Sequence, residues 1–176
     1  MKIKSTNFKD LKVISSPVHN DQRGSFREIF KKKFLKNKKF IFTCVSSSKK
    51  NVLRGMHLQT KKSQGKYLTV LKGEILDVSV DLRKNSKSFG KYFSIKLSDK
   101  NGISVYIPPG FAHGFIGLKK ENIISYHCTN YRSKKHEVGI IWNDKDIRIK
   151  WPIKSPILSR KDKKNISLKE YTAKYA

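Results

Sequence analysis

Three observations predict an all-β sandwich or barrel for this chain. Strand-like segments rich in β-branched and aromatic residues recur about every ten residues. Turns rich in Gly, Asn and Pro separate them, and no internal repeat, linker or low-complexity segment divides the chain. Because 176 residues suffice for one core, residues 1–176 are expected to form a single domain.

The expected elements follow from local alternation and from turn residues. A turn is expected at 19–24, one short basic helix at 31–39, a polar turn at 47–51 and helical segments from Ser159 onward. The expected strands, in chain order, are 8–14, 25–30, 40–46, 67–83, 91–97, 104–107, 114–118 and 123–129.

Segment 67–83 is the clearest strand region, and Gly73 is expected to divide it into a hairpin. After this glycine, Leu76, Val78, Val80 and Leu82 occupy one face, while Asp77, Ser79 and Asp81 occupy the other. Asn101-Gly102 is a strong hairpin-turn signal, so a second hairpin is expected there.

The chain is strongly basic, with 40 Lys+Arg against 13 Asp+Glu and a formal net charge of +27. Such a charge suits a polyanion such as nucleic acid or an anionic membrane surface, or a smaller anion such as a sugar nucleotide. Lysine outweighs arginine and is spread along the whole chain, whereas nucleic-acid modules concentrate their charge on one element. We therefore do not expect a nucleic-acid partner.

Cysteine usage and hydropathy predict a cytoplasmic protein. Cys44 and Cys128 form no CxxC pair, which suggests buried thiols in a reducing compartment. No apolar run approaches the roughly 18 residues of a membrane span, and the N-terminus lacks the apolar segment of a signal peptide. No membrane partner is expected.

A first group of chemically useful residues surrounds the segment Leu53 to Gln59. Arg54, His57, Gln59 and Lys66 place two cations, an imidazole and an amide close together. Cations beside a histidine suit an anionic substrate whose reaction requires the removal of a proton. The alternative is a basic hairpin that carries a surface histidine.

A second group lies between Gly102 and His113, where Pro108 and Gly110 precede the histidine. This spacing resembles the second motif of the cupin superfamily, which implies a cupin-type jelly-roll β-barrel with short C-terminal helical segments. Metal-binding cupins carry His-x-His and a glutamate in their first motif, whereas this chain has His57-Leu58-Gln59. No metal site is therefore expected, and the histidines remain available for acid–base chemistry.

An ordered set of motifs from about Asp21 to Asp162 narrows this resemblance. The matching residues are Asp21, Arg23, Gly24, Phe26 and Glu28; Leu53 to His57 and Gln59; Gln64 to Lys66; Gly73, Asp77, Val78 and Val80 to Arg83; Phe89 to Lys91; Ile107 to Phe115; Tyr126, Cys128 and Thr129; Trp142 to Asp144; Trp151 and Pro152; and Leu158, Ser159, Lys161 and Asp162. Together they resemble the dTDP-4-dehydrorhamnose 3,5-epimerase family.

The resemblance implies a cofactor-independent isomerase of a 4-keto-6-deoxy sugar nucleotide. The C4 ketone acidifies the hydrogens at C3 and C5, so one proton is removed and another returns from the opposite face. His57 matches the family's base, Asp162 the carboxylate that orients it, Tyr126 the acid and Lys66 the cation that stabilises the enolate. The expected substrate-binding residues are Arg23, Glu28, Arg54, Gln59, Asp77 and His113.

Several of these residues also fit purely structural roles. Taken alone, His113 suits a satisfied core histidine, Tyr126 an amphipathic strand, Asp162 a helix N-terminus and Asp77 a brace for the hairpin. Only the ordered set of motifs favours functional roles for these residues.

One departure from the family concerns the substrate. The family usually has glutamine and asparagine at positions where this chain has Phe42 and Cys44, on a strand associated with substrate binding. The expected substrate is dTDP-4-dehydro-6-deoxyglucose, with a 3-epimerase, a 5-epimerase or a ketoisomerase of another nucleotide as alternatives. A basic polyanion-binding cupin without activity is the alternative from another class. The family further implies a homodimer that exchanges strands between its sheets.

Overall fold

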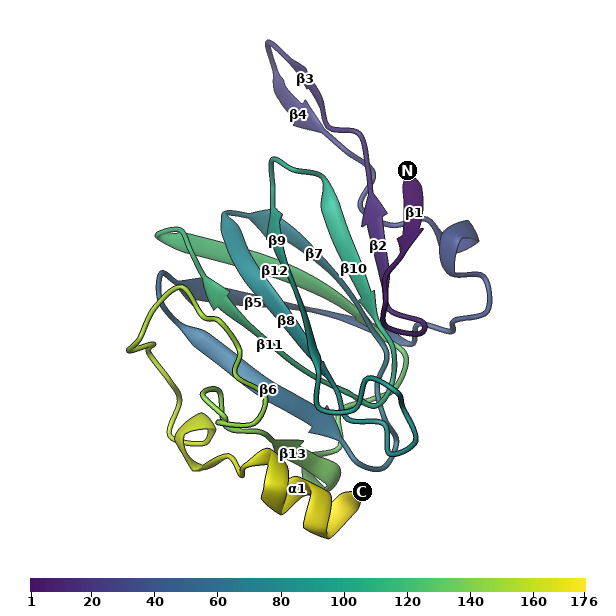
Figure 1. Cartoon of the computed structure of the whole chain (residues 1–176). Coiled ribbons are helices and arrows are strands. Elements are labelled where there is room, and N and C mark those ends of the chain that lie inside the picture. The colour runs from purple at the N-terminus through teal and green to yellow at the C-terminus, as the bar shows by residue number, and fades with distance from the viewer.

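The computed structural model describes residues 1–176, and it consists mainly of β-strands with one short helix at the C-terminus (Figure 1). This confirms the expected all-β class with short C-terminal helical segments. Two antiparallel sheets make up the body of the protein, and a separate two-stranded sheet forms an arm.

Each sheet draws its strands from distant parts of the chain. The six-stranded sheet contains β1 (Lys2–Ser5), β2 (Lys12–Ser15), β5 (Phe42–Lys49), β7 (Lys66–Lys72), β10 (Ile103–Ile107) and β12 (Glu121–Cys128). The five-stranded sheet contains β6 (Leu53–Gln59), β8 (Glu74–Asp81), β9 (Tyr92–Ser98), β11 (Phe111–Gly117) and β13 (Glu137–Gly139). The remaining elements are β3 (His19–Asp21), β4 (Gly24–Phe26), the 3-10 helices η1 (Lys32–Leu35), η2 (Lys134–His136) and η3 (Asp162–Lys164), and α1 (Leu168–Tyr175).

The chain crosses between the two sheets at most of its turns. The sheet orders are β1-β2-β10-β7-β12-β5 and β13-β6-β11-β8-β9, so β7 and β8 belong to different sheets, as do β9 and β10. The predicted hairpins at Gly73 and at Asn101-Gly102 are therefore wrong, although a turn lies at each place. Gly73 has a φ of +84°, and a Cβ there would lie 2.2 Å from the backbone oxygen of Glu121. Glycine at this position thus allows the tight passage from one sheet to the other.

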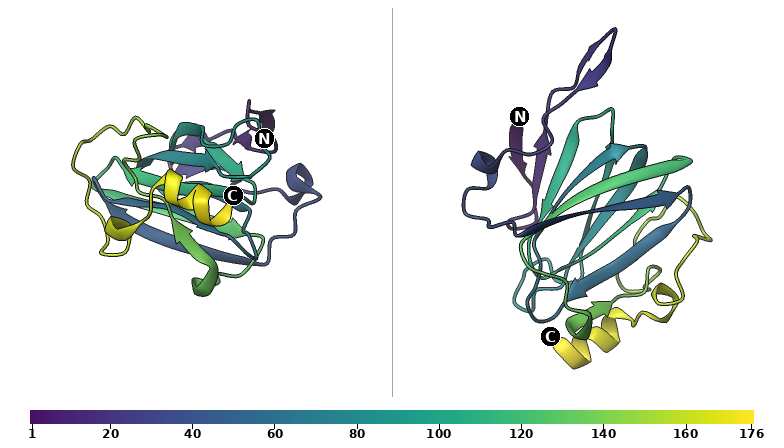
Figure 2. Two further views of the ribbon diagram at one scale, coloured as in Figure 1. Left: turned by 60° about the horizontal axis from the view of Figure 1, so that its bottom comes forward. Right: turned by 180° about the vertical axis from the view of Figure 1, so that it is seen from behind.

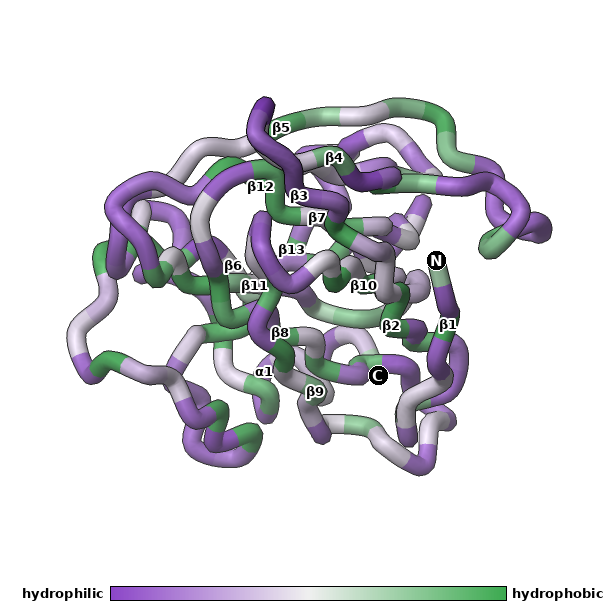
Figure 3. The backbone as a smooth tube through the Cα atoms, turned by 90° about the horizontal axis from the view of Figure 1, so that it is seen from above, coloured by the Kyte–Doolittle hydropathy of each residue, from purple (hydrophilic) through white to green (hydrophobic).

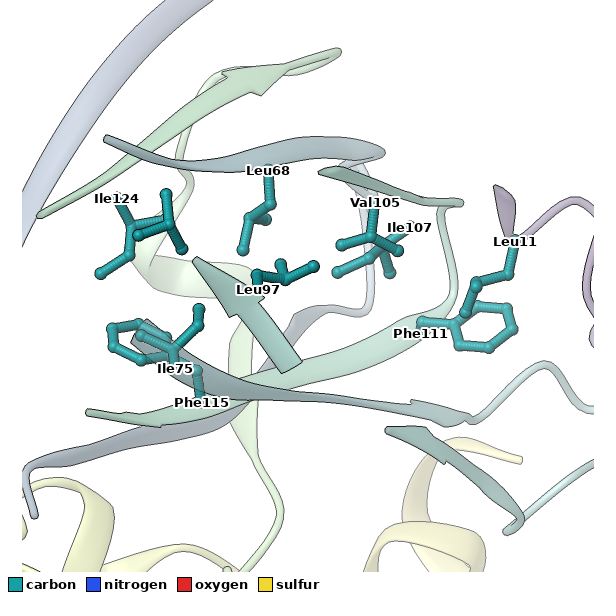
Figure 4. Close-up of a cluster of buried hydrophobic side chains, with 10 residues drawn as sticks. Leu11, Leu68, Ile75, Leu97, Val105, Ile107, Phe111, Phe115 and Ile124 are labelled. Atoms are coloured by element: carbon teal, nitrogen blue, oxygen red, sulfur yellow. The ribbon is translucent and has the colours of Figure 1, made fainter. Parts of the chain in front are cut away.

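Two apolar clusters lie on the two faces of the five-stranded sheet. The inner cluster fills the space between the sheets (Figure 4), and its members are Leu11, Leu68, Val70, Ile75, Leu97, Val105, Ile107, Phe111, Phe115 and Ile124. The outer cluster includes Val78 and Val80, which pack against Ile140 and against Tyr171 of α1. Both faces of β8 are therefore buried, because the C-terminal segment covers the outer one. Hydrophobic residues accordingly gather along the central strands, while the peripheral loops are largely hydrophilic (Figure 3).

The N-terminal region differs most from its predicted elements. The expected strand at 8–14 starts only at Lys12, because Phe8 and Leu11 turn inward to pack on the inner cluster. Strands β3 and β4 form an arm that projects well away from the two sheets (Figures 1 and 2). Within 31–39 only η1 is helical, as a single short 3-10 segment.

The C-terminal helix α1 begins at a complete capping box. The side chain of Ser167 accepts a hydrogen bond from the backbone N–H of Glu170, and the Glu170 carboxylate accepts one from the Ser167 backbone. Asp144 accepts a further hydrogen bond, of 2.8 Å, from the N–H of Leu168 and so ties the helix to the body. None of the helices combines the length and the apolar character that a membrane crossing requires.

Candidate active site

A cavity of about 790 Å³ lies between the two sheets, within the range of small-molecule sites. His57 on β6 and His113 on β11 line it from the five-stranded sheet, while Lys66 on β7 and Tyr126 on β12 line it from the six-stranded sheet. A larger hollow of about 960 Å³ elsewhere is lined by lysine, serine and a few acidic residues, with no hydrophobic residue and no histidine. The chemistry therefore concentrates in the smaller cavity.

His57 forms a short hydrogen bond with a buried carboxylate. Its Nε2 lies 2.5 Å from Oδ1 of Asp162, and the hydroxyl of Ser159 accepts a hydrogen bond from the Asp162 backbone N–H. Burial raises the pKa of Asp162, but the hydrogen bond and the charge of His57 bring it below the ordinary value. Asp162 thus stays ionised, orients the imidazole and can stabilise the imidazolium that forms when His57 accepts a proton.

A second histidine–carboxylate pair lies beside the first. Nε2 of His113 is 2.6 Å from Oδ2 of Asp77, and both side chains are buried. His113 and His57 face each other in the pairing of β11 with β6. A glycine at Gly55 permits this close pairing, because a Cβ there would lie 2.5 Å from the Cα of Gly114.

Tyr126 lies on the other wall and is partly buried. Its hydroxyl is 2.9 Å from that of Ser46, and its ring is edge-on to His113 with 6.4 Å between centroids. Burial raises the pKa of Tyr126 well above its usual value. The phenol therefore keeps its proton at neutral pH and can donate it to a carbanion in the cavity.

Two cationic side chains, Lys66 and Arg54, line the same cavity. Burial lowers the pKa of the Lys66 amine, and the negative charges of Glu137 and Asp77 oppose this without a hydrogen bond to it. Arg54 instead is fixed, since its Nε donates to Ser48 Oγ at 2.8 Å and an Nη donates to the Ser47 carbonyl.

Gln59 lines the cavity, but backbone groups take up most of the hydrogen-bonding capacity of its side chain. Its amide nitrogen donates to the carbonyls of Lys62 and Tyr131, and its oxygen accepts from the N–H of Ser133 at 2.7 Å. These contacts hold the loop after β12 against β6. Its expected contact with substrate stays a prediction.

Arg23 and Glu28 lie outside this cavity. Arg23 is at the tip of the arm, where it pairs with Asp21 at 2.6 Å while remaining almost fully exposed. Glu28 pairs with Lys31 near the base of the arm. Within one chain, then, the structure brings together all of the expected site residues except these two.

Sequence reasoning missed one charged cluster at the cavity. Glu137 accepts hydrogen bonds from Arg132, at 2.8 Å, and from Lys161. Although burial raises it, these two contacts lower the pKa of Glu137 to about 2. Nothing local distinguishes Glu137 in the sequence, because one of its partners is 24 residues away.

Phe42 and Cys44 both face the cavity from β5. Phe42 stacks on Tyr131 with ring centroids 5.7 Å apart. Cys44 is exposed rather than buried, which corrects the expectation of two buried thiols, whereas Cys128 is buried as expected. No group of three or more His, Cys, Asp or Glu side chains is arranged to hold a metal ion.

Comparison with known proteins agrees with this geometry. The model of the dTDP-4-dehydrorhamnose 3,5-epimerase family matches residues 5–170. A dTDP-4-dehydrorhamnose 3,5-epimerase of Methanothermobacter thermautotrophicus is 41% identical over 165 residues, which cover 90% of this chain and 89% of the relative.

Solved structures of related enzymes superpose along nearly the whole chain. The dTDP-4-dehydrorhamnose 3,5-epimerase of Elizabethkingia anophelis has a TM-score of 0.89 and 38% identity, covering 100% of this chain and 99% of that one. The Legionella pneumophila dTDP-6-deoxy-D-glucose-3,5-epimerase, in complex with dTDP-4-keto-L-rhamnose, has a TM-score of 0.90 and 37% identity, covering 96% and 93%. The expected cupin-type jelly roll is thereby confirmed, and the chain belongs to the dTDP-4-dehydrorhamnose 3,5-epimerase family.

Proposed function

We propose that this protein inverts C3 and C5 of dTDP-4-dehydro-6-deoxyglucose without a cofactor, giving dTDP-4-dehydrorhamnose. The observation that carries this proposal is the placement of a base and an acid on opposite walls of one cavity. His57 lies on the five-stranded sheet and is hydrogen-bonded to Asp162 of η3, whereas Tyr126 and Ser46 lie on the six-stranded sheet. The sugar carbon loses its proton to one wall, and the planar enolate that results receives a proton from the opposite wall.

Each polar group has a defined part in this reaction. His57 removes the acidic hydrogen next to the C4 ketone, and the Asp162 carboxylate stabilises the imidazolium that results. Tyr126 returns a proton to the opposite face of the sugar. His113 lines the cavity beside Tyr126, and the buried Asp77 carboxylate holds its imidazole in place.

Lys66 stabilises the intermediate rather than the ground state. Its burial disfavours the charged amine, and no carboxylate forms an ion pair with it. The enolate oxygen supplies the missing negative charge only when the proton has left the sugar carbon. The interaction is therefore stronger in the transition state than with the neutral ketone, which is the condition for catalysis.

Solvent isotope exchange tests the reaction and separates it from its alternatives. In deuterated water the enzyme is expected to incorporate solvent deuterium at both C3 and C5 of the product. Exchange at one carbon alone would identify a mono-epimerase, and transfer of the ketone to C3 would identify a ketoisomerase. A 4-keto sugar nucleotide that gains no deuterium at all would overturn the proposal.

A homodimer would give Arg23 and Glu28 access to substrate. The arm that carries Arg23 extends away from its own sheets (Figure 2). Phe26 on this arm is exposed over 67% of its surface. We infer that the arm reaches the cavity of a partner subunit, where Arg23 meets the diphosphate and Glu28 the base.

Subunit complementation tests this arrangement. One variant carries Arg23→Ala and Glu28→Ala, and the other carries His57→Asn. If the arm acts on the partner, mixed dimers regain activity that neither variant has alone, because an intact arm meets an intact cavity. If the arm acts within its own chain, mixing restores nothing.

The remaining expectations concern the chain as a whole. Residues 1–176 act as one catalytic domain, which the inner apolar cluster shared by both sheets supports. Two unpaired thiols support a reducing compartment, the cytoplasm.

A further inference from the structure

We propose that Cys44 and Cys128 form a two-thiol site in the wall of the cavity, which binds one soft metal ion and thereby closes the cavity to substrate. Neither cysteine has a part in the proton transfers proposed above. The effect on substrate rests on the proposed function, whereas the metal site itself does not.

The strand register places the two cysteines together. In the antiparallel pairing of β5 with β12, Cys44 is opposite Tyr126 and Cys128 is opposite Phe42. The two cysteines are therefore diagonal neighbours on the same face of the sheet. That face lines the cavity, and both side chains contribute to its wall.

The Cys44 thiol affects the pKa of Cys128. Burial raises the pKa of Cys128 to about 11, the Cys44 thiol contributes to the rise, and the Lys66 ammonium opposes it. At neutral pH Cys128 is thus a protonated thiol and a poor nucleophile on its own. A soft metal ion changes this, since it displaces the thiol protons and binds the thiolates.

The binding step is a simple exchange of protons for metal. A divalent soft ion forms two metal–sulfur bonds, the two S–H bonds break, and two protons leave to solvent. No electron is transferred, so the step requires no oxidant. Thiolate sulfur selects soft ions over magnesium or calcium, which prefer oxygen ligands.

The same register disfavours a disulfide. Diagonal neighbours in antiparallel strands lie about 7–8 Å apart. A disulfide requires Cα atoms roughly 4.4–6.8 Å apart, so joining these cysteines directly would move the backbone. A bridging ion adds two bonds of about 2.3 Å and spans the pair without such movement.

An ion held there would lie among the groups that handle substrate. Cys128 pairs with Lys66 across β12 and β7, and Cys44 pairs with Tyr126 across β5 and β12. The ion would fill the space beside the Tyr126 phenol and the Lys66 amine. It would therefore exclude the substrate from this part of the cavity by its volume.

Titration of the full-length protein with Cd²⁺ tests the site directly. Ultraviolet charge-transfer absorption reports cadmium bound by thiolate and ignores cadmium bound by histidine or carboxylate. We expect the absorption to saturate at one ion per chain, to strengthen as pH rises, and to weaken when dTDP fills the cavity. Inhibition of epimerisation is expected to follow the same titration curve.

Single variants provide the controls. Cys44→Ser and Cys128→Ser should each weaken cadmium binding by at least the roughly 10–100-fold that loss of an outer-shell partner costs a metal site. Inhibition in each variant is measured against its own untreated rate. Thiolate absorption that persists unchanged in either variant would overturn the two-thiol site. Stoichiometric binding without inhibition would overturn the closure of the cavity, and rapid disulfide formation under mild oxidant would refute the register argument. The absorption needs no turnover, so its outcome is independent of the proposed reaction.

Discussion

Replacing Tyr126 by phenylalanine is expected to separate proton removal from inversion. The change deletes one hydroxyl, which lies 2.9 Å from Ser46 Oγ, and leaves the ring that packs against His113 in place. His57 and Asp162 on the opposite wall are untouched. The variant should still form the enolate, but it lacks the proton donor on the far side.

The expected magnitudes differ enough to be told apart. A positioned general acid contributes about 10²–10⁴-fold in rate, which is roughly 2.7–5.5 kcal/mol of the barrier. Loss of one hydrogen bond costs only about 0.5–1.5 kcal/mol of folding free energy. For a chain of this size each kcal/mol lowers Tm by about 2–4 °C. The variant should therefore remain folded while inversion almost stops.

The assay follows deuterium incorporation and epimerised product in the same reaction by NMR. Wild-type protein should show both together, whereas Tyr126→Phe should retain exchange at the sugar carbons and lose inversion. Ser46→Ala is the matched control, because it removes the same hydrogen bond but keeps the phenol, and it should lose far less activity.

Two results would refute this reasoning. Full inversion by Tyr126→Phe would show that another group donates the proton. Equal loss of inversion in Tyr126→Phe and Ser46→Ala would show that the hydrogen bond, and not the phenol, is what matters.

Three further variants test the rest of the site. Asp162→Asn should lower kcat by about 10²–10⁴-fold, because the imidazolium of His57 loses its counter-charge, and circular dichroism should show an intact fold; a near-normal rate would contradict this. Lys66→Met should cost about 10²–10³-fold in kcat with little change in dTDP affinity, measured by calorimetry, because the cation acts on the enolate; a change in affinity alone would contradict it. Glu137 has a folded-state pKa of about 2 against an ordinary 4.5, so its stabilising effect is present above about pH 4.5 and is lost as pH falls toward 2. Glu137→Gln should therefore lower Tm at pH 7 much more than at pH 2.5, and an equal loss at both would contradict the ion-pair cluster.

Turn chemistry predicted where the chain reverses, but not which sheet the next strand joins. Gly73 and Asn101-Gly102 do mark turns, and in both cases the chain passes to the other sheet instead of forming a hairpin. A positive φ suits either outcome, so the sequence cannot separate them locally. The choice depends on long-range burial, as when the C-terminal segment covers Val78 and Val80.

The acid–base residues were predictable because their order along the chain is characteristic of the family. The relatives confirm the family and the epimerase activity. The structure brings His57 to Asp162 across 105 residues, which no periodicity indicates. Their catalytic roles stay predictions. Glu137 could not be predicted from the sequence, because its lowered pKa depends on two cationic partners that only the folded chain brings to it.

The crossing of the chain between sheets also has a consequence for folding kinetics. In the two main sheets, only the pairs β1–β2 and β8–β9 join strands that are consecutive in sequence. Other pairs join distant segments: β5 pairs with β12, and Ser46 and Tyr126 on these strands are 80 residues apart. Loops of this length must close before the sheets gain their stabilising contacts. Proteins dominated by such distant pairings fold in about milliseconds to seconds, far more slowly than helical bundles. The topology that places acid and base on facing walls therefore also makes this chain a slow folder, with strand edges left unpaired until the last sheet closes.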